Sequence, residues 1–76
     1  MKNLNLDKSL LILFGQNIKK AREDKGISQE ELATLIDSSR SFVSSIELGK
    51  TNPSLLTVLK LCKVLDIQDL NFLLGK

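Results

Sequence analysis

Hydrophobic residues recur along the chain at the three- and four-residue spacing of amphipathic helices, and no alternating strand pattern extends beyond a few residues. Glycine, serine, aspartate and proline interrupt this pattern at the places where helices are expected to begin or end. The expected helices run from Asp7 or Ser9 to Gly26, from Ser28 to Asp37, from Ser38 or Ser39 to Gly49, from Pro53 to Leu65 and from Ile67 to Leu74. The pattern therefore predicts one all-α domain of five helices over residues 1–76, with residues 1–8 as an N-terminal extension that is a candidate for disorder.

The second and third expected helices lie very close together in the sequence. The second begins with Ser28-Gln29-Glu30-Glu31, a capping box in which the serine and the last glutamate each satisfy the other's backbone amide. Only Asp37-Ser38-Ser39 separates it from the third helix, and Ala33 is small enough for two helices to cross closely. Two helices joined by such a turn form a helix-turn-helix, in which the second helix lies in the DNA major groove.

The third expected helix has an unusual polar face. Val43 and Ile46 point to one side, whereas the opposite side carries three serines with Arg40 at its edge. Serine is a mediocre helix former, and exposed faces more often carry Glu and Lys. Short side chains let a helix approach a partner closely, and arginine can bond guanine in two places. On this helix alone, a DNA-reading face and a poorly optimised solvent face both stay open.

The chain has more apolar residues than one face per helix can bury. For the fourth helix, the pattern predicts a core stripe of Leu55, Val58, Leu59, Cys62 and Leu65. Several apolar residues fall outside the expected stripes, namely Ile12, Leu13, Leu61, Val64 and Phe72. We expect these five to form the interface of a homodimer, since small domains without disulfides or metals often need a partner. Wide burial inside one small core is the alternative.

Composition excludes most chemistry. The 76 residues contain no His, Trp or Tyr and a single Cys, which rules out a Ser-His-Asp or Cys-His triad, a His-containing metal site and an intrachain disulfide. We expect no enzymatic activity, no cofactor or metal, and no small-molecule ligand. Cys62 is expected to be a small buried hydrophobe. The net charge of +2, from 11 Lys and Arg against 9 Asp and Glu, indicates nothing by itself.

No address or membrane segment is recognisable. The longest early apolar run, Leu10 to Phe14, is far shorter than the roughly 20 residues needed to cross a bilayer. We therefore expect a cytoplasmic protein with no membrane partner.

Several segments together resemble the XRE/Cro family of phage-repressor-like helix-turn-helix regulators. They are Ile18-Lys19-Lys20-Ala21-Arg22, Gly26-Ile27-Ser28-Gln29-Glu30-Glu31-Leu32-Ala33, Val43-Ser44-Ser45-Ile46-Glu47-Leu48-Gly49-Lys50 and Asn52-Pro53-Ser54-Leu55. Each piece is weak, but the ordered set over about residues 14–74 is specific. The resemblance implies a lambda-repressor-like fold and binding to a double-stranded DNA operator.

The resemblance also implies roles for individual residues. Base readout falls to Arg40, Ser41, Ser44 and Ser45. Phosphate contacts fall to Lys19, Lys20, Ser28, Gln29, Ser39, Lys50 and Thr51. Gln29 is also implied to brace the reading helix, and Arg22 with Glu47 to form an ion pair that ties the first helix to the end of the third.

Two positions depart from the family pattern. Asp37 stands where the turn usually has glycine, and aspartate tolerates the left-handed conformation better than most residues. Phe42 stands where many relatives have tyrosine, and without a hydroxyl it cannot bond a phosphate. We expect Phe42 to pack against the protein rather than stack on nucleic acid.

Two functions follow, and they belong to different classes. The first is a dimeric transcriptional regulator that reads a pseudo-palindromic operator with its third helix. The second is a protein-interaction module, such as an antitoxin or antirepressor, in which the DNA face is residual. RNA binding is a weaker third option, because the chain lacks an aromatic stacking platform. Within the family, the chain resembles restriction–modification controller proteins and small prophage repressors equally.

Overall fold

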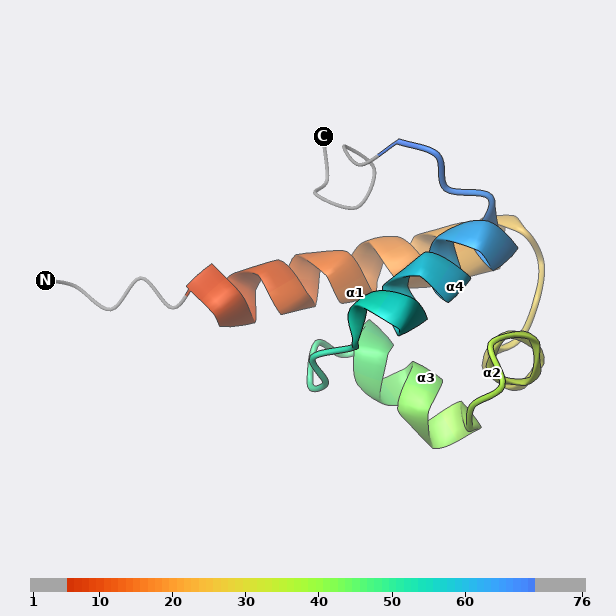
Figure 1. Cartoon of the computed structure of the whole chain (residues 1–76), viewed down its shortest axis with the longest axis horizontal. Helices are drawn as coiled ribbons and strands as arrows, with labels where there is room; N and C mark the ends of the chain where they lie inside the picture. Colours follow the sequence, from red (N-terminus) through yellow and green to blue (C-terminus); the bar gives the residue numbers. More distant parts are fainter. Residues whose placement is uncertain (1–5, 70–76) are drawn as a thin grey trace, which may run out of the picture.

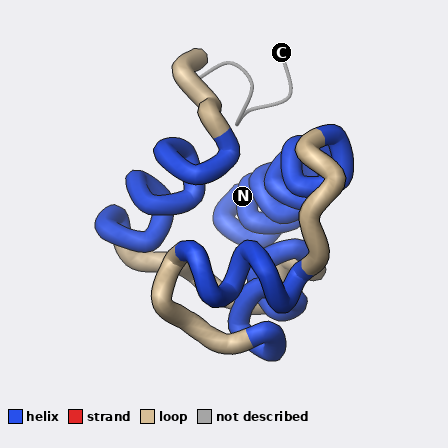
Figure 2. The backbone as a smooth tube through the Cα atoms, turned by 90° about the vertical axis from the view of Figure 1, so that its right-hand side faces the viewer, coloured by secondary structure: helices blue, strands red, loops and turns tan. Residues whose placement is uncertain are grey.

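The computed structural model describes residues 6–69 and contains four helices in that part of the chain. They are α1 (Leu6–Asp24), α2 (Gln29–Leu35), α3 (Arg40–Glu47) and α4 (Leu55–Leu65) (Figure 1). No strand is present among the described residues (Figure 2). The all-α prediction is confirmed, but the predicted count of five helices is not. The expected fifth helix would begin at Ile67, where the chain is a loop as far as Asp69, and its remainder lies outside the described residues.

Serine hydroxyls mark the starts of the three short helices. Ser28, Ser39 and Ser54 each accept a hydrogen bond from the backbone N–H three residues further on, at 3.0–3.1 Å. The predicted capping box at α2 is present in full, because the Ser28 amide donates to Glu31 Oε1 at 2.7 Å. The first helix begins earlier than expected: residues 6–8 are helical and do not belong to an extension.

All four helices end in the same way. The first or second residue after each helix takes the left-handed conformation, with φ of +73° at Gly26, +59° at Asp37, +75° at Gly49 and +60° at Asp66. In each case the next amide donates back to a carbonyl in the last turn of the helix, as Ser38 N does to Ala33 O at 2.8 Å. Asp37 therefore adopts the conformation expected of it in the turn between α2 and α3.

The core lies where α1, α2, α3 and α4 meet. Its buried hydrophobic members are Ile18, Ala21, Leu32, Ala33, Ile36, Val43, Ile46, Leu61 and Leu65. α2 and α1 both pack extensively on α3, so that α3 is held from two sides, while the N-terminal part of α1 projects beyond the other helices (Figure 1). Among the described residues, no helix is both long enough and apolar enough to cross a membrane.

The core face of α4 differs from the prediction. Leu61 is completely buried, whereas Leu55 and Leu59 are 73% and 56% exposed. The predicted stripe was therefore partly wrong: Leu65, Val58 and Cys62 pack in or against the core as expected, but Leu61 takes the place of Leu55 and Leu59. Leu61 cannot be an interface residue, as was expected, because its side chain is enclosed by its own protomer.

Gly15 marks the closest approach of α1 to α3. A Cβ placed there would lie 2.3 Å from the carbonyl oxygen of Ile46 and 2.8 Å from that of Glu47. Real Cβ contacts are never that short, and both neighbours are backbone atoms that cannot rotate away. Only glycine lets α1 rest directly on the last turn of α3.

Candidate nucleic-acid interface

The outward face of α3 is polar, as its sequence predicts. Val43 and Ile46 are each 1% exposed and form the inward face, whereas Arg40 and Ser41 are exposed. Phe42 is half-buried and packs against the core, in agreement with a packing role. The outward face thus begins with a free arginine, and the first turn of α3 holds no acidic residue to neutralise it.

The orientation of α3 is fixed by a buried ion pair. Arg22 Nε on α1 donates to Glu47 Oε2 at 2.7 Å, and Nη2 donates to Oε1 at 3.2 Å. The third guanidinium nitrogen donates to the carbonyl of Ile27 at 2.9 Å. The hydrogen bond to Glu47 is the main cause that raises the pKa of Arg22 above its already high ordinary value. The pair connects α1, the α1–α2 loop and the end of α3.

Gln29 joins the same network from the start of α2. Its side-chain Nε2 donates to Glu47 Oε1 at 2.9 Å. The carboxylate of Glu47 therefore receives hydrogen bonds from α1 and α2 at once, and this accounts for the bracing role that the resemblance implies for Gln29. An amide nitrogen has two N–H groups, so a second one stays available to a ligand.

A groove of about 310 Å³ opens beside this network, between α1, α2 and the outward face of α3. Polar side chains from all three helices line it, namely Gln16, Lys19, Gln29, Ser44 and Glu47, together with Ile12 and Leu48. The structure thus brings together Lys19, Gln29 and Ser44, which the sequence could only assign separately. Gln16 was missed, although its position one turn before Lys19 on a helix places the two on the same face.

Ser45 and Thr51 are also brought together. Their hydroxyls, Oγ and Oγ1, form a hydrogen bond between α3 and the loop that follows it. Both residues are half-buried, while the neighbouring Lys50 is exposed.

The two helix starts differ in what they offer to an anion. Ser28 and Ser39 both cap a helix, but α2 carries Glu30 and Glu31 in its first turn, and the Glu31 carboxylate already occupies the Ser28 amide. A carboxylate satisfies the positive end of a helix dipole in the way that a phosphate would. The start of α2 is therefore a weaker place for a phosphate than the sequence suggested.

Lys20 lies outside the groove. Its ammonium is 3.6 Å from the carboxylate of Asp24, one turn further along α1, and both side chains are about two-thirds exposed. Exposed pairs of this kind contribute only about 0.3–0.5 kcal/mol, so a phosphate could compete for this lysine.

Among the described residues predicted for a dimer interface, Ile12 alone is classed as exposed. Ile12 is 38% exposed on α1, whereas Leu13 and Val64 are half-buried, and Val64 packs against the core. Phe72 lies outside the described residues. The large exposed hydrophobic residues of α4 are instead Leu55, Leu56 and Leu59.

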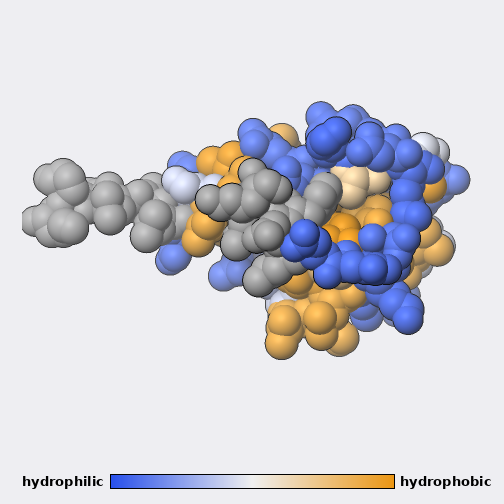
Figure 3. All heavy atoms as spheres, turned by 90° about the horizontal axis from the view of Figure 1, so that it is seen from above, coloured by the Kyte–Doolittle hydropathy of each residue, from blue (hydrophilic) through white to orange (hydrophobic). Residues whose placement is uncertain are grey.

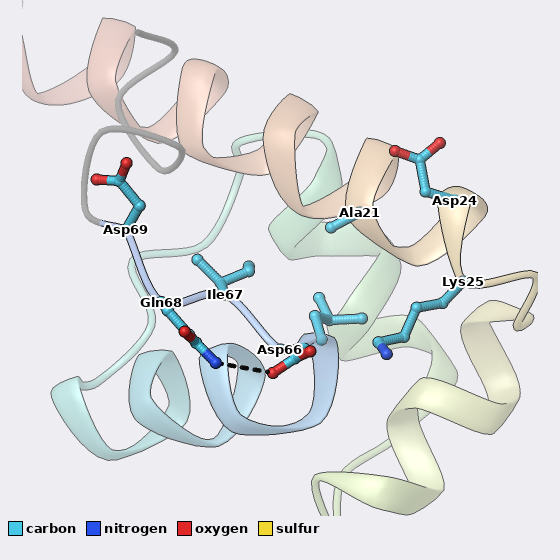
Figure 4. A pocket seen from close by; sticks show the side chains of 8 residues that line it. Ala21, Asp24, Lys25, Asp66, Ile67, Gln68 and Asp69 are labelled. Atoms are coloured by element: carbon cyan, nitrogen blue, oxygen red, sulfur yellow. Dashed lines mark hydrogen bonds between the residues drawn. The ribbon is translucent and has the colours of Figure 1, made fainter.

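A cavity of about 540 Å³ lies on another side of the molecule, between the end of α1 and the segment after α4 (Figure 4). Its walls include Asp24, Lys25 and Asp66, and the Gln68 side chain donates to Asp66 Oδ1 at 3.3 Å. None of the predicted DNA-contacting residues lines it. In the part of the chain that is described, no cluster of three or more Cys, Asp or Glu side chains is arranged to hold a metal ion.

Comparison with known proteins fits this geometry. The sequence model of the helix-turn-helix family matches residues 18–70, which include the ion pair, both helices of the motif and α4. The chain belongs to the helix-turn-helix family. Its members of the XRE type are DNA-binding transcriptional regulators, and the membership expected from the sequence motifs is confirmed.

Helix-turn-helix relatives of two kinds are similar to this chain. The control protein C.MunI of a Mycoplasma species is 46% identical over 57 residues, which are 74% of this chain and 77% of that protein. The SPbeta prophage-derived regulator YonR of Bacillus subtilis is 37% identical over 55 residues, 72% of this chain but 51% of its own length. The chain therefore spans about half of YonR.

A solved helix-turn-helix structure shares the fold. The restriction–modification controller protein C.AhdI from Aeromonas hydrophila superposes with a TM-score of 0.76 at 44% sequence identity, over 83% of this chain and 94% of that one. The arrangement of α1 to α4 is thus the fold of a controller protein.

Proposed function

We propose that this protein is a sequence-specific double-stranded-DNA binder that regulates transcription as a homodimer in the cytoplasm, without catalytic activity. One observation carries the proposal: α3 presents an exposed Arg40 and Ser41 on a small polar face, while the Arg22–Glu47 pair holds the helix rigidly from behind. A rigid helix with short outward side chains suits the major groove, where arginine bonds guanine O6 and N7.

The phosphate contacts surround that face. Lys19 and Gln29 line the groove beside α3, and Lys50 is exposed just after the helix ends. Such contacts set the register of the protein on DNA, whereas base-edge contacts give the sequence preference. Occupying an operator would then block or recruit polymerase according to where the operator lies.

The homodimer is supported by the exposed leucines of α4. Leu55, Leu56 and Leu59 are 73%, 62% and 56% exposed and are neighbours on one helical surface. Hydrophobic side chains also reach the molecular surface in the view from above (Figure 3). A twofold dimer would place two copies of α3 about 34 Å apart and would read a pseudo-palindromic site.

The dimer is tested by Leu56→Ser. Each protomer then loses the burial of one leucine, and the two losses together should raise the dimer dissociation constant about 100-fold or more in sedimentation equilibrium. Leu48→Ser is the matched control, because Leu48 is 59% exposed but lies just after α3 and not on α4, and it should leave the constant unchanged. A monomeric wild-type protein, or equal effects of both substitutions, would contradict this interface.

DNA binding is tested by a salt-controlled gel-shift assay on the DNA upstream of the protein's own gene, since regulators of this kind commonly control themselves. We expect tight binding to one duplex, with affinity that falls steeply as salt rises. Non-specific micromolar binding together with a stable complex with another protein would favour a protein-interaction module instead. The second function is supported by seven large hydrophobic residues that are exposed in the part of the chain that the structure describes. Relatives of both kinds leave a controller protein and a prophage regulator as equal candidates.

A further inference from the structure

The C-terminal half of the outward face of α3 is fastened to the loop that follows it. The hydroxyl of Ser45 is bonded to that of Thr51, and the backbone carbonyl of Ser45 accepts the amide of Lys50 at 2.9 Å. One residue of α3 therefore holds two successive loop residues, one through its side chain and one through its main chain. Sequence resemblance assigned Ser45 to base readout and Thr51 to phosphate contact, as two independent roles.

Resting on the proposed function, we propose that Ser45 is a positioning residue that acts through Thr51 on Lys50, and that base readout falls to Arg40 and Ser41. Each hydroxyl has a single O–H, and their mutual bond consumes one of the two. Ser45 and Thr51 therefore cannot both donate to DNA while they are bonded to each other. Whichever of the two donates that bond has no O–H left for DNA.

The position of Lys50 depends on this tether. On the other side of the loop, Gly49 has φ +75° and sits against α1 so closely that a Cβ would lie 2.8 Å from Ile12 Cα. Lys50 therefore lies between two residues that are held in place, Gly49 and Thr51, and its side chain is exposed. A lysine near a phosphate contributes affinity whatever the base sequence. Ser45 should accordingly influence how tightly DNA is bound and not which sequence is preferred.

The remaining serines support this division of roles. Ser44 is half-buried and lines the groove with Lys19 and Gln29, on the side of the face turned toward α1. Ser41 is exposed beside Arg40 at the start of the helix. We therefore expect the protein to prefer particular bases only over a short stretch of each half-site, opposite the first turn of α3.

The test uses three substitutions in the full chain. Ser45→Ala and Thr51→Val each remove one hydroxyl, whereas Thr51→Ser keeps it. Dissociation constants are measured at fixed salt for the preferred duplex and for all its single-base-pair variants. Ser45→Ala and Thr51→Val should each weaken binding to every duplex by the same factor, about three- to tenfold, and leave the ranking of duplexes unchanged. Thr51→Ser should stay within about twofold of the wild type, and the double variant should be no weaker than either single one.

Other outcomes would overturn the assignment. A change of preference at one base pair in Ser45→Ala but not in Thr51→Val would make Ser45 a reader, and additive losses would show that the two hydroxyls act separately. Hydrogen exchange of the Lys50 amide gives a readout without DNA: it should speed up in Ser45→Ala and Thr51→Val and not in Thr51→Ser. A wild-type protein that ranks no duplex above another would contradict the proposed function, while the exchange rates would still decide the tether.

Discussion

α3 and α4 begin alike and present opposite surfaces. Each is capped by a serine and buries one apolar face, but the outward side of α3 carries arginine and serines, whereas that of α4 carries three leucines. They are also held differently. Directional contacts fix α3, namely the ion pair of Glu47 and the backbone contact at Gly15, while α4 is anchored by the buried side chains of Leu61 and Leu65.

The difference teaches what each surface is suited for. Hydrogen bonds and backbone contacts set an angle, and a helix that reads base edges needs a fixed angle. Apolar burial is not directional and tolerates small shifts, which is sufficient for a helix that meets a second copy of itself. Substitutions in the two helices should therefore differ in the property that they change as well as in the size of the effect.

The largest effect is expected from Glu47→Gln, which attacks the anchoring of α3. It leaves the charge of Arg22 buried without its partner, and we expect a loss of about 3–5 kcal/mol in the free energy of unfolding. Urea denaturation measures it. Glu31→Gln is the control, because Glu31 is exposed and glutamine can keep the capping box. A loss no greater than that of the control would mean that the pair does not hold α3.

The next effect compares two leucines of α4. Leu61→Ala should destabilise the protein by about 2–5 kcal/mol, because it leaves a cavity in the core. Leu59→Ala changes an exposed side chain of the same type and should cost no more than about 0.5 kcal/mol when the protein is monomeric. Thermal unfolding at low protein concentration measures both. Equal losses would contradict the burial of Leu61 and the exposure of Leu59.

The smallest expected effect is on base preference. Arg40→Ala should lower discrimination at one base pair of each half-site by about 1–3 kcal/mol, without affecting unfolding. Binding to randomised sites measures the preference. Lys50→Ala is the matched control, since losing a phosphate contact should weaken binding to all sequences alike. If the preference profile of Arg40→Ala equals that of the wild type, Arg40 is not a reader.

The sequence predicted α3 much better than α4. In α3, the inward residues Val43 and Ile46 stand out against serines, so only one face could be buried. α4 reads LLTVLKLCKVL, and almost any stripe along it is apolar. Its informative residues are Lys60 and Lys63: the face opposite to them contains Val58, Leu61 and Leu65, which is the face that the structure buries or half-buries.

Cys62 is a second case in which the sequence predicted the burial of an α4 residue only approximately. It was expected in the core, and it is half-buried and packed against it, where burial raises the pKa of its thiol. A raised pKa keeps the thiol protonated and unreactive at neutral pH.

Contacts between side chains far apart in the sequence were only partly predictable. Family resemblance indicated the pairing of Arg22 with Glu47, but nothing in the sequence indicated that Ser45 meets Thr51. That bond depends on the path of the loop after Gly49. The contact of Gly49 with α1 sets this path, and the hydrophobic pattern of the sequence does not reveal it. Gly15 did leave a signal, because a glycine inside a helix usually has a packing reason.

The contact at Gly15 has a consequence for variation of this protein. Because α1 rests on main-chain oxygens of α3, the position of α3 against α1 does not depend on which side chains the outward face of α3 carries. Residues 40 and 41 could then be exchanged for others to redirect the protein to new operators, with the docking angle conserved. The glycine that permits no replacement would thus leave residues 40 and 41, at the other end of α3, freely replaceable.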